Sequence, residues 1–227
     1  MFRPALAAVM MIATAAPAFA ADAAHPTVVE LFQSQGCSSC PPAIHNVNAL
    51  ADRPDVLTLT FAVTYWDQLG WKDTFATPQQ TARQWDYARG LGHDQVWTPQ
   101  VIVDGRSDVV GARPGQVADL LARTPPRVGP TLTLATQAVS IGTGAAPAGG
   151  ADVWLVRYDP RTIAVAVRAG ENGGRTIDHR NVVRQLVKLG HWTGAAATIT
   201  LPAPMPGLQT AILVQKPGGA ILAAVRG

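Results

Sequence analysis

The chain has 227 residues, a formal net charge of +3 and a hydrophobic fraction of 48%, and only 15% of its residues are charged. A composition this apolar excludes an intrinsically disordered chain and predicts a packed core. The basic excess is too small to predict a nucleic-acid partner, and the two cysteines are too few for a scaffold held by disulfides. The length fits one or two domains.

Residues 1–20 have the pattern of a secretory signal peptide. Arg3 supplies a positive start, an apolar run follows, and Ala18-Phe19-Ala20 forms a small-x-small cleavage site. An uncleaved membrane anchor is the alternative, but the run is short for a span of about 20 apolar residues. Later stretches are shorter still, so we expect a mature chain without an integral membrane segment. The predicted location is outside the cytoplasm, either periplasmic or extracellular.

Residues 25–123 alternate between strand and helix patterns. Strands are expected where apolar residues run together or alternate, and helices where they recur at helical spacing. We expect strands over residues 28–32 and 57–65, helices over 37–51, 78–91 and 114–122, and a hairpin of residues 101–103 and 109–110. The predicted order is β-α-β-α-β-β-α, an α/β domain.

Residues 124–130 contain three prolines and a glycine, and we interpret them as a linker. Beyond them, residues 131–227 hold short strand candidates separated by turns, which predict an all-β, sandwich-like domain. The expected strands cover residues 131–139, 153–158, 162–168, 182–189, 197–201, 210–215 and 221–225.

Cys37-Ser38-Ser39-Cys40 follow the first predicted strand and open the first helix. The partial positive charge and free N–H groups of a helix N-terminus favour a thiolate at Cys37. Cys40 lies one helical turn further on, where it can attack a mixed disulfide formed at Cys37 and release the substrate. The motif predicts a redox-active pair in which Cys37 attacks and Cys40 resolves.

Two other interpretations of the pair stay open. A Cys37–Cys40 disulfide could be structural, although so small a ring constrains little of the unfolded chain. The two thiolates could also hold a soft metal ion such as Cu(I), with His25, His45 or His93 as a further ligand. A single CxxC is a weak predictor of zinc, and we expect neither a metal nor any other cofactor.

Trp97, Thr98 and Pro99 immediately precede the third predicted strand. A cis Thr98-Pro99 bond would place a backbone edge beside the cysteines, where an extended substrate could pair. Trp97 would add an apolar contact for that substrate, and a position in the core is the alternative. Glu30 lies in the first strand and could accept the proton of Cys40; a salt bridge at the strand end is the alternative.

Residues 170–175 form, with Asp178, His179 and Arg180, the main polar cluster of the second half. Glycine-rich segments between strands are commonly turns, so we interpret this one as a plain turn. A docking loop is the alternative.

The predicted element order, with CxxC at the first helix and Thr-Pro before the third strand, resembles the thioredoxin fold. Residues 28–43, 65–73, 97–101 and 170–175 are together similar to a family of secreted bacterial proteins of unknown function with a thioredoxin-like domain. This resemblance implies a thioredoxin-like fold for residues 25–123 and export, but no specific reaction. The Ser-Ser dipeptide lacks the histidine of strongly oxidising relatives and the proline of common reductants, so the direction of electron flow stays open.

These patterns together predict an exported enzyme, a thiol–disulfide oxidoreductase. Its substrate would be a protein or small-molecule disulfide or dithiol, and a separate redox partner would recycle it. Two alternatives remain, a copper-binding or copper-transfer protein and a non-catalytic adaptor with a passive disulfide.

Overall fold

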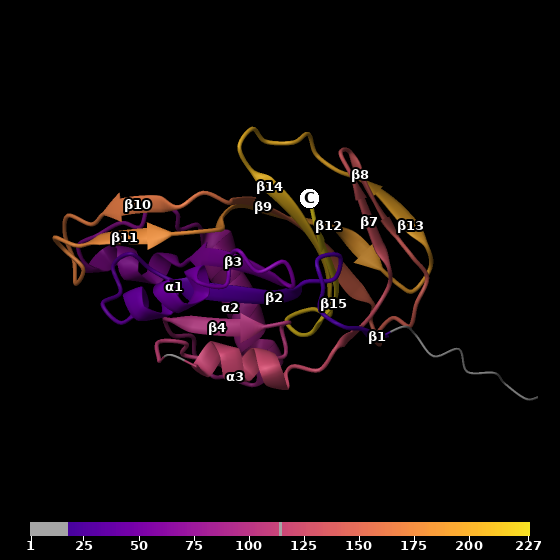
Figure 1. Ribbon diagram of the computed structural model, residues 1–227, viewed down its shortest axis with the longest axis horizontal. Coiled ribbons are helices and arrows are strands. Elements are labelled where there is room, and N and C mark those ends of the chain that lie inside the picture. Colours follow the sequence, from indigo (N-terminus) through magenta and orange to yellow (C-terminus); the bar gives the residue numbers. More distant parts are fainter. Residues whose placement is uncertain (1–17, 114) are drawn as a thin grey trace, which may run out of the picture.

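One eight-stranded mixed sheet runs through both halves of the chain in the computed structural model, which describes residues 18–113 and 115–227. Its strand order is β15-β14-β9-β12-β3-β2-β4-β5 (Figure 1). The first half contributes β2 (Thr27–Gln33), β3 (Val56–Ala62), β4 (Gln100–Val103) and β5 (Ser107–Val109). The second half contributes β9 (Ala151–Asp159), β12 (Val182–Trp192), β14 (Gln209–Gln215) and β15 (Ile221–Arg226).

The expected boundary at residues 124–130 does not divide this sheet. β12 pairs in parallel with β3 at Val182 and Thr60, so the two halves meet along their backbones. Within the expected linker, β6 (Arg127–Val128) pairs with β1 (Ala18–Phe19). The buried Arg127 guanidinium lies 2.6 Å from the carboxylate of Asp104. Proline content indicates a turn-rich segment, but it carries no information about such a tertiary ion pair.

The expected cleavage site lies partly in β1, whereas residues 1–17 of the predicted signal peptide lie outside the described residues. No helix in residues 18–113 and 115–227 is long and apolar enough to cross a membrane.

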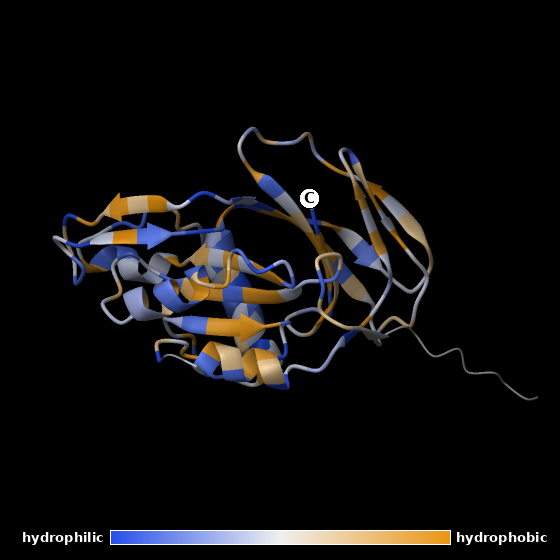
Figure 2. Ribbon diagram, viewed as in Figure 1, coloured by the Kyte–Doolittle hydropathy of each residue, from blue (hydrophilic) through white to orange (hydrophobic). Residues whose placement is uncertain are grey.

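Helices cover both faces of the first-half strands. α1 (Cys40–Asn48) and α3 (Gln116–Arg123) pack on one face, and α2 (Pro78–Leu91) packs on the other. Because both faces are covered, β2 and β3 are mostly apolar and are buried along nearly their whole length. Hydrophobic stretches lie on β2 and β4 in Figure 2.

Local signals define α2 particularly well. The hydroxyl of Thr77 accepts a hydrogen bond from the backbone N–H of Gln80, and Pro78 occupies the first turn, where its missing N–H costs nothing. Gly92 ends the helix in a left-handed conformation with φ 77°. The predicted range of 78–91 is the observed one.

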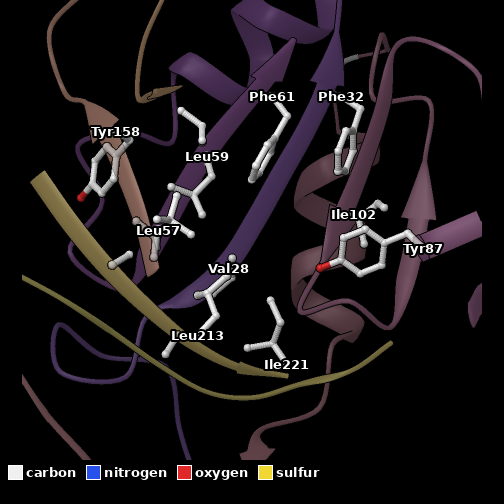
Figure 3. Close-up of a cluster of buried hydrophobic side chains, with 14 of the residues drawn as sticks. Val28, Phe32, Leu57, Leu59, Phe61, Tyr87, Ile102, Tyr158, Leu213 and Ile221 are labelled. Atoms are coloured by element: carbon white, nitrogen blue, oxygen red, sulfur yellow. The ribbon is translucent and has the colours of Figure 1, made fainter. Parts of the chain in front are cut away.

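The largest core cluster joins the two halves. Figure 3 shows side chains of β2, β3, β4 and α2 packed with Tyr158 of β9, Leu213 of β14 and Ile221 of β15. Buried apolar area is the main source of folding free energy. The second half is therefore part of the structure that supports the first.

A second, three-stranded sheet contains β7 (Leu132–Ala135), β8 (Ala138–Ile141) and β13 (Ala197–Thr200). Val139 and Ile141 of β8 pack against Val153 and Leu155 of β9, which gives the second half a sandwich-like core. The single strand expected over residues 131–139 is in fact the β7–β8 hairpin, because residues 136–137 form a turn.

Between β9 and β12 the chain leaves the sheet as a two-stranded ribbon of β10 (Ile163–Ala166) and β11 (Thr176–His179). The ribbon lies beside α1 (Figure 1). Val167 and Ile177 pack in one cluster with Ile44 and both cysteines. The strand expected over residues 162–168 thus belongs to this ribbon, which brings residues 167–175 of the second half to the cysteine motif.

Candidate functional site around the cysteine pair

Cys37 and Cys40 form a disulfide at the start of α1, with their Cα atoms 5.4 Å apart. A turn joins β2 to the helix: the N–H of Cys37 donates to the Ser34 carbonyl at 3.1 Å. Both cysteines have 0% exposure, although Ser38 and Ser39 between them are exposed. The expected disulfide is present, and its sulfur atoms are covered.

The segment before Cys37 is fixed by residues that follow η1, a 3-10 helix (Thr64–Leu69). The carboxylate of Asp73 accepts the N–H of Gln35 at 2.7 Å and the N–H of Phe75 at 2.8 Å. Burial raises the pKa of Asp73 to about 6, against the opposing effect of these hydrogen bonds. The indole N–H of Trp71 donates to the Gln35 side-chain oxygen at 2.9 Å.

Thr98 lies next to the cysteine motif, as the sequence predicts. The Ser39 hydroxyl oxygen lies 3.3 Å from the Cys37 sulfur and 3.4 Å from the Thr98 carbonyl oxygen. The indole N–H of Trp66 donates to the Thr98 hydroxyl at 2.7 Å. The Thr98-Pro99 peptide bond is cis.

Trp97 is half-buried and contacts α2 and its C-terminal loop. Its carbonyl oxygen accepts a hydrogen bond from the Gln84 side chain at 2.7 Å, and the same amide donates to Gln100 at 2.9 Å. The Trp97 ring packs edge-on against His93, with centroids 4.9 Å apart. These contacts hold the backbone that leads into Thr98. Among the described residues, no hydrogen bond or ring contact joins Trp97 to either cysteine.

Glu30 does not lie with the cysteines. Successive residues of a strand face opposite sides, and Glu30 shares its side of β2 with the residues that pack on α2. Its carboxylate accepts from the Arg83 guanidinium at 2.8 Å and from the Tyr87 hydroxyl. The cysteines pack instead with Val29 and Leu31, on the other side of the strand. The expected proton transfer from Cys40 to Glu30 is therefore not supported, because Glu30 points to the side of β2 opposite the cysteines.

Residues 170–175 connect β10 to β11 and dock on the cysteine segment. The fully buried Asn172 amide donates to the carbonyls of Gln35 at 2.9 Å and Cys37 at 2.8 Å. The Glu171 carboxylate accepts the backbone N–H of Ser38 at 3.0 Å, and its hydrogen bonds with Ser38 lower the pKa of Glu171. This corrects the interpretation of these residues as a plain turn.

The sequence analysis kept a docking loop as the alternative for residues 170–175, but it assigned no individual role to Glu171, Asn172 or Gln35. The available signals were the polar cluster itself and the inclusion of residues 28–43 and 170–175 among the stretches that support the family resemblance. Nothing in their local pattern indicates a contact with residues far earlier in the chain.

The histidines lie apart from the pair. His45 is exposed on α1, and the His93 ring lies 3.2 Å from the Asp108 carboxylate. Within residues 18–113 and 115–227, histidine, cysteine, aspartate and glutamate side chains form no group of three or more that could hold a metal ion.

Comparison with known proteins gives a family and two similar structures. Residues 28–215 match the family model described as a protein of unknown function (DUF1223). None of the curated proteins matches the chain. The crystal structure of protein AGR_C_4864 from Agrobacterium tumefaciens is 32% identical, with a TM-score of 0.75 over 92% of this chain and 95% of that one.

HBP35 of Porphyromonas gingivalis has a similar fold at 12% identity, with a TM-score of 0.56 over 90% of this chain and 75% of that one.

The family match covers most of the chain, including the cysteine pair, Thr98-Pro99 and the docked loop. The chain therefore belongs to the DUF1223 family of proteins of unknown function.

Proposed function

We propose that this protein is an exported thiol–disulfide oxidoreductase whose catalytic unit is thioredoxin-like. The observation that carries the proposal is the disulfide at the N-terminus of α1, with a Ser39 hydroxyl that lies 3.3 Å from the Cys37 sulfur and 3.4 Å from the Thr98 carbonyl oxygen. The order β2-α1-β3-α2-β4-β5-α3, with β2 parallel to β3 and antiparallel to β4, supports the thioredoxin-like assignment.

The chemistry is a two-step exchange that moves two electrons. When the pair acts as a reductant, the Cys37 thiolate attacks one sulfur of the substrate disulfide, and the other substrate sulfur leaves as a thiolate. The Cys40 thiolate then attacks the Cys37 sulfur of this mixed disulfide and releases the second substrate thiolate. The substrate is reduced and the pair is oxidised; in the oxidising direction the same steps run in reverse. A separate dithiol or disulfide partner restores the starting state.

Two features of the site favour the attacking thiolate. The Ser39 hydroxyl, 3.3 Å from the Cys37 sulfur, can donate a hydrogen bond to the negative charge. The free N–H groups at the start of α1 add a partial positive charge. The backbone at Thr98 offers an extended substrate a place to pair beside the sulfur.

Burial of the pair favours a second candidate, a non-catalytic adaptor with a passive disulfide. Cys37 and Cys40 both have 0% exposure, so a substrate disulfide reaches Cys37 only if covering residues move. A pair that never exchanges would leave the surfaces of the second half as the functional part.

Equilibration of the full mature chain in glutathione buffers of increasing reducing power distinguishes the two candidates. We expect a reversible transition between the disulfide and dithiol forms. In addition, Cys40→Ser should retain a mixed disulfide at Cys37, whereas the matched variant Cys37→Ser should retain far less. A folded protein whose disulfide never equilibrates would refute the enzyme and leave the adaptor.

Export has its own test. Intact-mass measurement of protein recovered from outside the cytoplasm should show that residues 1–20 have been removed. A chain that keeps these residues and stays in the cytoplasm would contradict this part of the proposal.

A further inference from the structure

A carboxylate from the second half of the chain binds the backbone just before the N-terminus of the redox helix. The Glu171 side chain accepts the backbone N–H of Ser38 at 3.0 Å, directly after Cys37 and just before α1 begins. N–H groups at this end of a helix are the ones that stabilise an adjacent thiolate. Glu171 therefore places a second negative group where the charge of Cys37 would form.

The loop that carries Glu171 is held firmly on the cysteine segment. Asn172 is completely buried, and its amide group bridges the carbonyls of Gln35 and Cys37. The guanidinium of Arg175 donates to the Asn172 side-chain oxygen at 3.0 Å, which fixes the orientation of the amide. Breaking these contacts would remove the side-chain donor of the Gln35 carbonyl and leave the Cys37 carbonyl with the backbone N–H of Cys40 alone.

Close backbone packing fixes the approach of this loop. Gly170 has φ +71°, and a Cβ there would lie 3.2 Å from the Cβ of Trp71. Trp71 in turn donates to the side chain of Gln35, on the segment that Asn172 holds. The loop thus fits against both the cysteine segment and the residues that brace it.

Among the described residues, three charged side chains belong to the hydrogen-bond network around the cysteine segment. Glu171 comes from the docked loop, and Arg175 lies on the same loop with its guanidinium on Asn172. Asp73 comes from the segment after η1 and binds the N–H of Gln35. Glu171 is the one of the three that accepts a hydrogen bond from within the cysteine motif.

We propose that Glu171 is a positioning residue that restrains the reactivity of Cys37, and that Asn172 holds it in place. The inference rests on the proposed function, because it assigns a regulator to the same redox pair. The Glu171 carboxylate repels the Cys37 thiolate and occupies an N–H group that would otherwise stabilise it. Destabilising the thiolate disfavours the reduced form, so the pair becomes a stronger reductant.

Alkylation of Cys37 by iodoacetamide tests the effect of Glu171 on the thiolate. The full mature chain with Cys40→Ala has one thiol, and its rate of alkylation against pH gives a midpoint for Cys37. Adding Glu171→Gln should lower that midpoint by roughly 0.2–0.7 pH unit, the range expected for a charge at a helix terminus. Below the midpoint, alkylation should be roughly two- to fivefold faster, while the plateau rate at high pH should stay the same.

Two further variants make the test specific. Asp178→Asn removes an exposed carboxylate from β11 of the same ribbon and should leave the midpoint unchanged. Asn172→Ala should lower the midpoint like Glu171→Gln and also raise the plateau, because it frees the covering loop. Circular dichroism of each variant verifies that it is folded. An unchanged midpoint in Glu171→Gln would overturn the inference, and an unchanged midpoint in Asn172→Ala would overturn the role of Asn172 in holding Glu171.

Failure of this inference and failure of the proposed function give different results. The alkylation titration needs only a free thiol at Cys37, whereas the glutathione equilibrium needs an exchanging pair. If the unmodified pair equilibrates but Glu171→Gln has no effect on the midpoint, the regulator alone is wrong. If the pair never equilibrates, the oxidoreductase proposal is wrong whatever the variants show.

Discussion

His179 makes the folding stability of this protein depend on pH, because its imidazole ring is completely buried. Neither ring nitrogen has a hydrogen-bond partner within residues 18–113 and 115–227. The ring packs edge-on against Phe75, with centroids 5.5 Å apart. Desolvation penalises the charged ring and lowers the pKa of His179 from 6.5 to about 4.

This depressed pKa sets the sign and size of the effect. Between pH 6.5 and about 4 the unfolded chain binds the His179 proton and the folded chain does not, so acid favours unfolding. Each pKa unit corresponds to about 1.4 kcal/mol. The contribution of His179 to the free energy of unfolding should therefore fall by about 2 kcal/mol between pH 7.5 and pH 5. The full loss should be about 3 kcal/mol once the pH is well below 4.

Urea unfolding at pH 7.5 and pH 5.0 measures this loss. His179→Leu cannot take up a proton, so its unfolding free energy should fall on acidification by about 2 kcal/mol less than that of the wild type. The matched control, His45→Gln, changes an exposed histidine of α1 and should retain the wild-type difference. Equal pH dependence in the wild type and His179→Leu, to within about 0.5 kcal/mol, would refute the reasoning.

The consequence of this protonation extends to the cysteine site. His179 lies on β11, which contacts α1, and the Asp178 carbonyl accepts a hydrogen bond from Asn48 of α1 at 2.7 Å. Protonation of His179 should therefore loosen the ribbon whose loop binds the cysteine segment.

Three other variants test contacts of the cysteine site and of the expected linker, residues 124–130. Burial raises the pKa of Asp73 to about 6, so Asp73 stabilises the fold in acid and this contribution disappears as pH rises from about 4 to 6. In urea titrations Asp73→Asn should therefore lose about 1 kcal/mol more than the wild type between pH 7.5 and pH 5, and an equal loss would contradict this. Arg127→Ala strands the buried Asp104 carboxylate and should lower the unfolding free energy by about 3–5 kcal/mol, so an unchanged urea midpoint would disprove the role of this ion pair. Ser39→Ala removes the hydroxyl beside the Cys37 sulfur and should move the alkylation midpoint to higher pH; the idea fails if the midpoint stays where it is.

The exposed ion pair of Arg89 with Asp86 is the matched control for Arg127→Ala. Arg89→Ala also removes a guanidinium from a carboxylate, but both groups stay in water. Its unfolding free energy should change by less than about 1 kcal/mol. A similar loss in the two variants would mean that burial does not decide the cost.

Local signals placed most elements of the first half. Apolar runs gave the strand at residues 28–32, observed as β2 (Thr27–Gln33), and α2 was bounded by Thr77, Pro78 and Gly92. The helix expected from Cys37 begins only at Cys40, because residues 34–39 turn between strand and helix. The strand expected to reach Tyr65 ends at Ala62, where the chain enters η1.

The disulfide could also be predicted from the sequence, because the chain has only two cysteines and they lie three residues apart. The side of β2 that Glu30 faces could not be predicted from the sequence. Alternation groups Glu30 with Val28 and Phe32, but β2 is buried on both sides, so its sequence does not reveal which side α1 covers.

The sequence by itself determined most of the segments that form strands and helices, and that a cysteine pair stands at a helix N-terminus. These features depend on neighbouring residues, through backbone preferences, capping and turn formation. Only the tertiary structure decided that β12 pairs with β3, and that Glu171 and Asn172 dock on the cysteine segment. Such contacts join residues more than one hundred positions apart, and they exist because burying a shared core brings the two halves together.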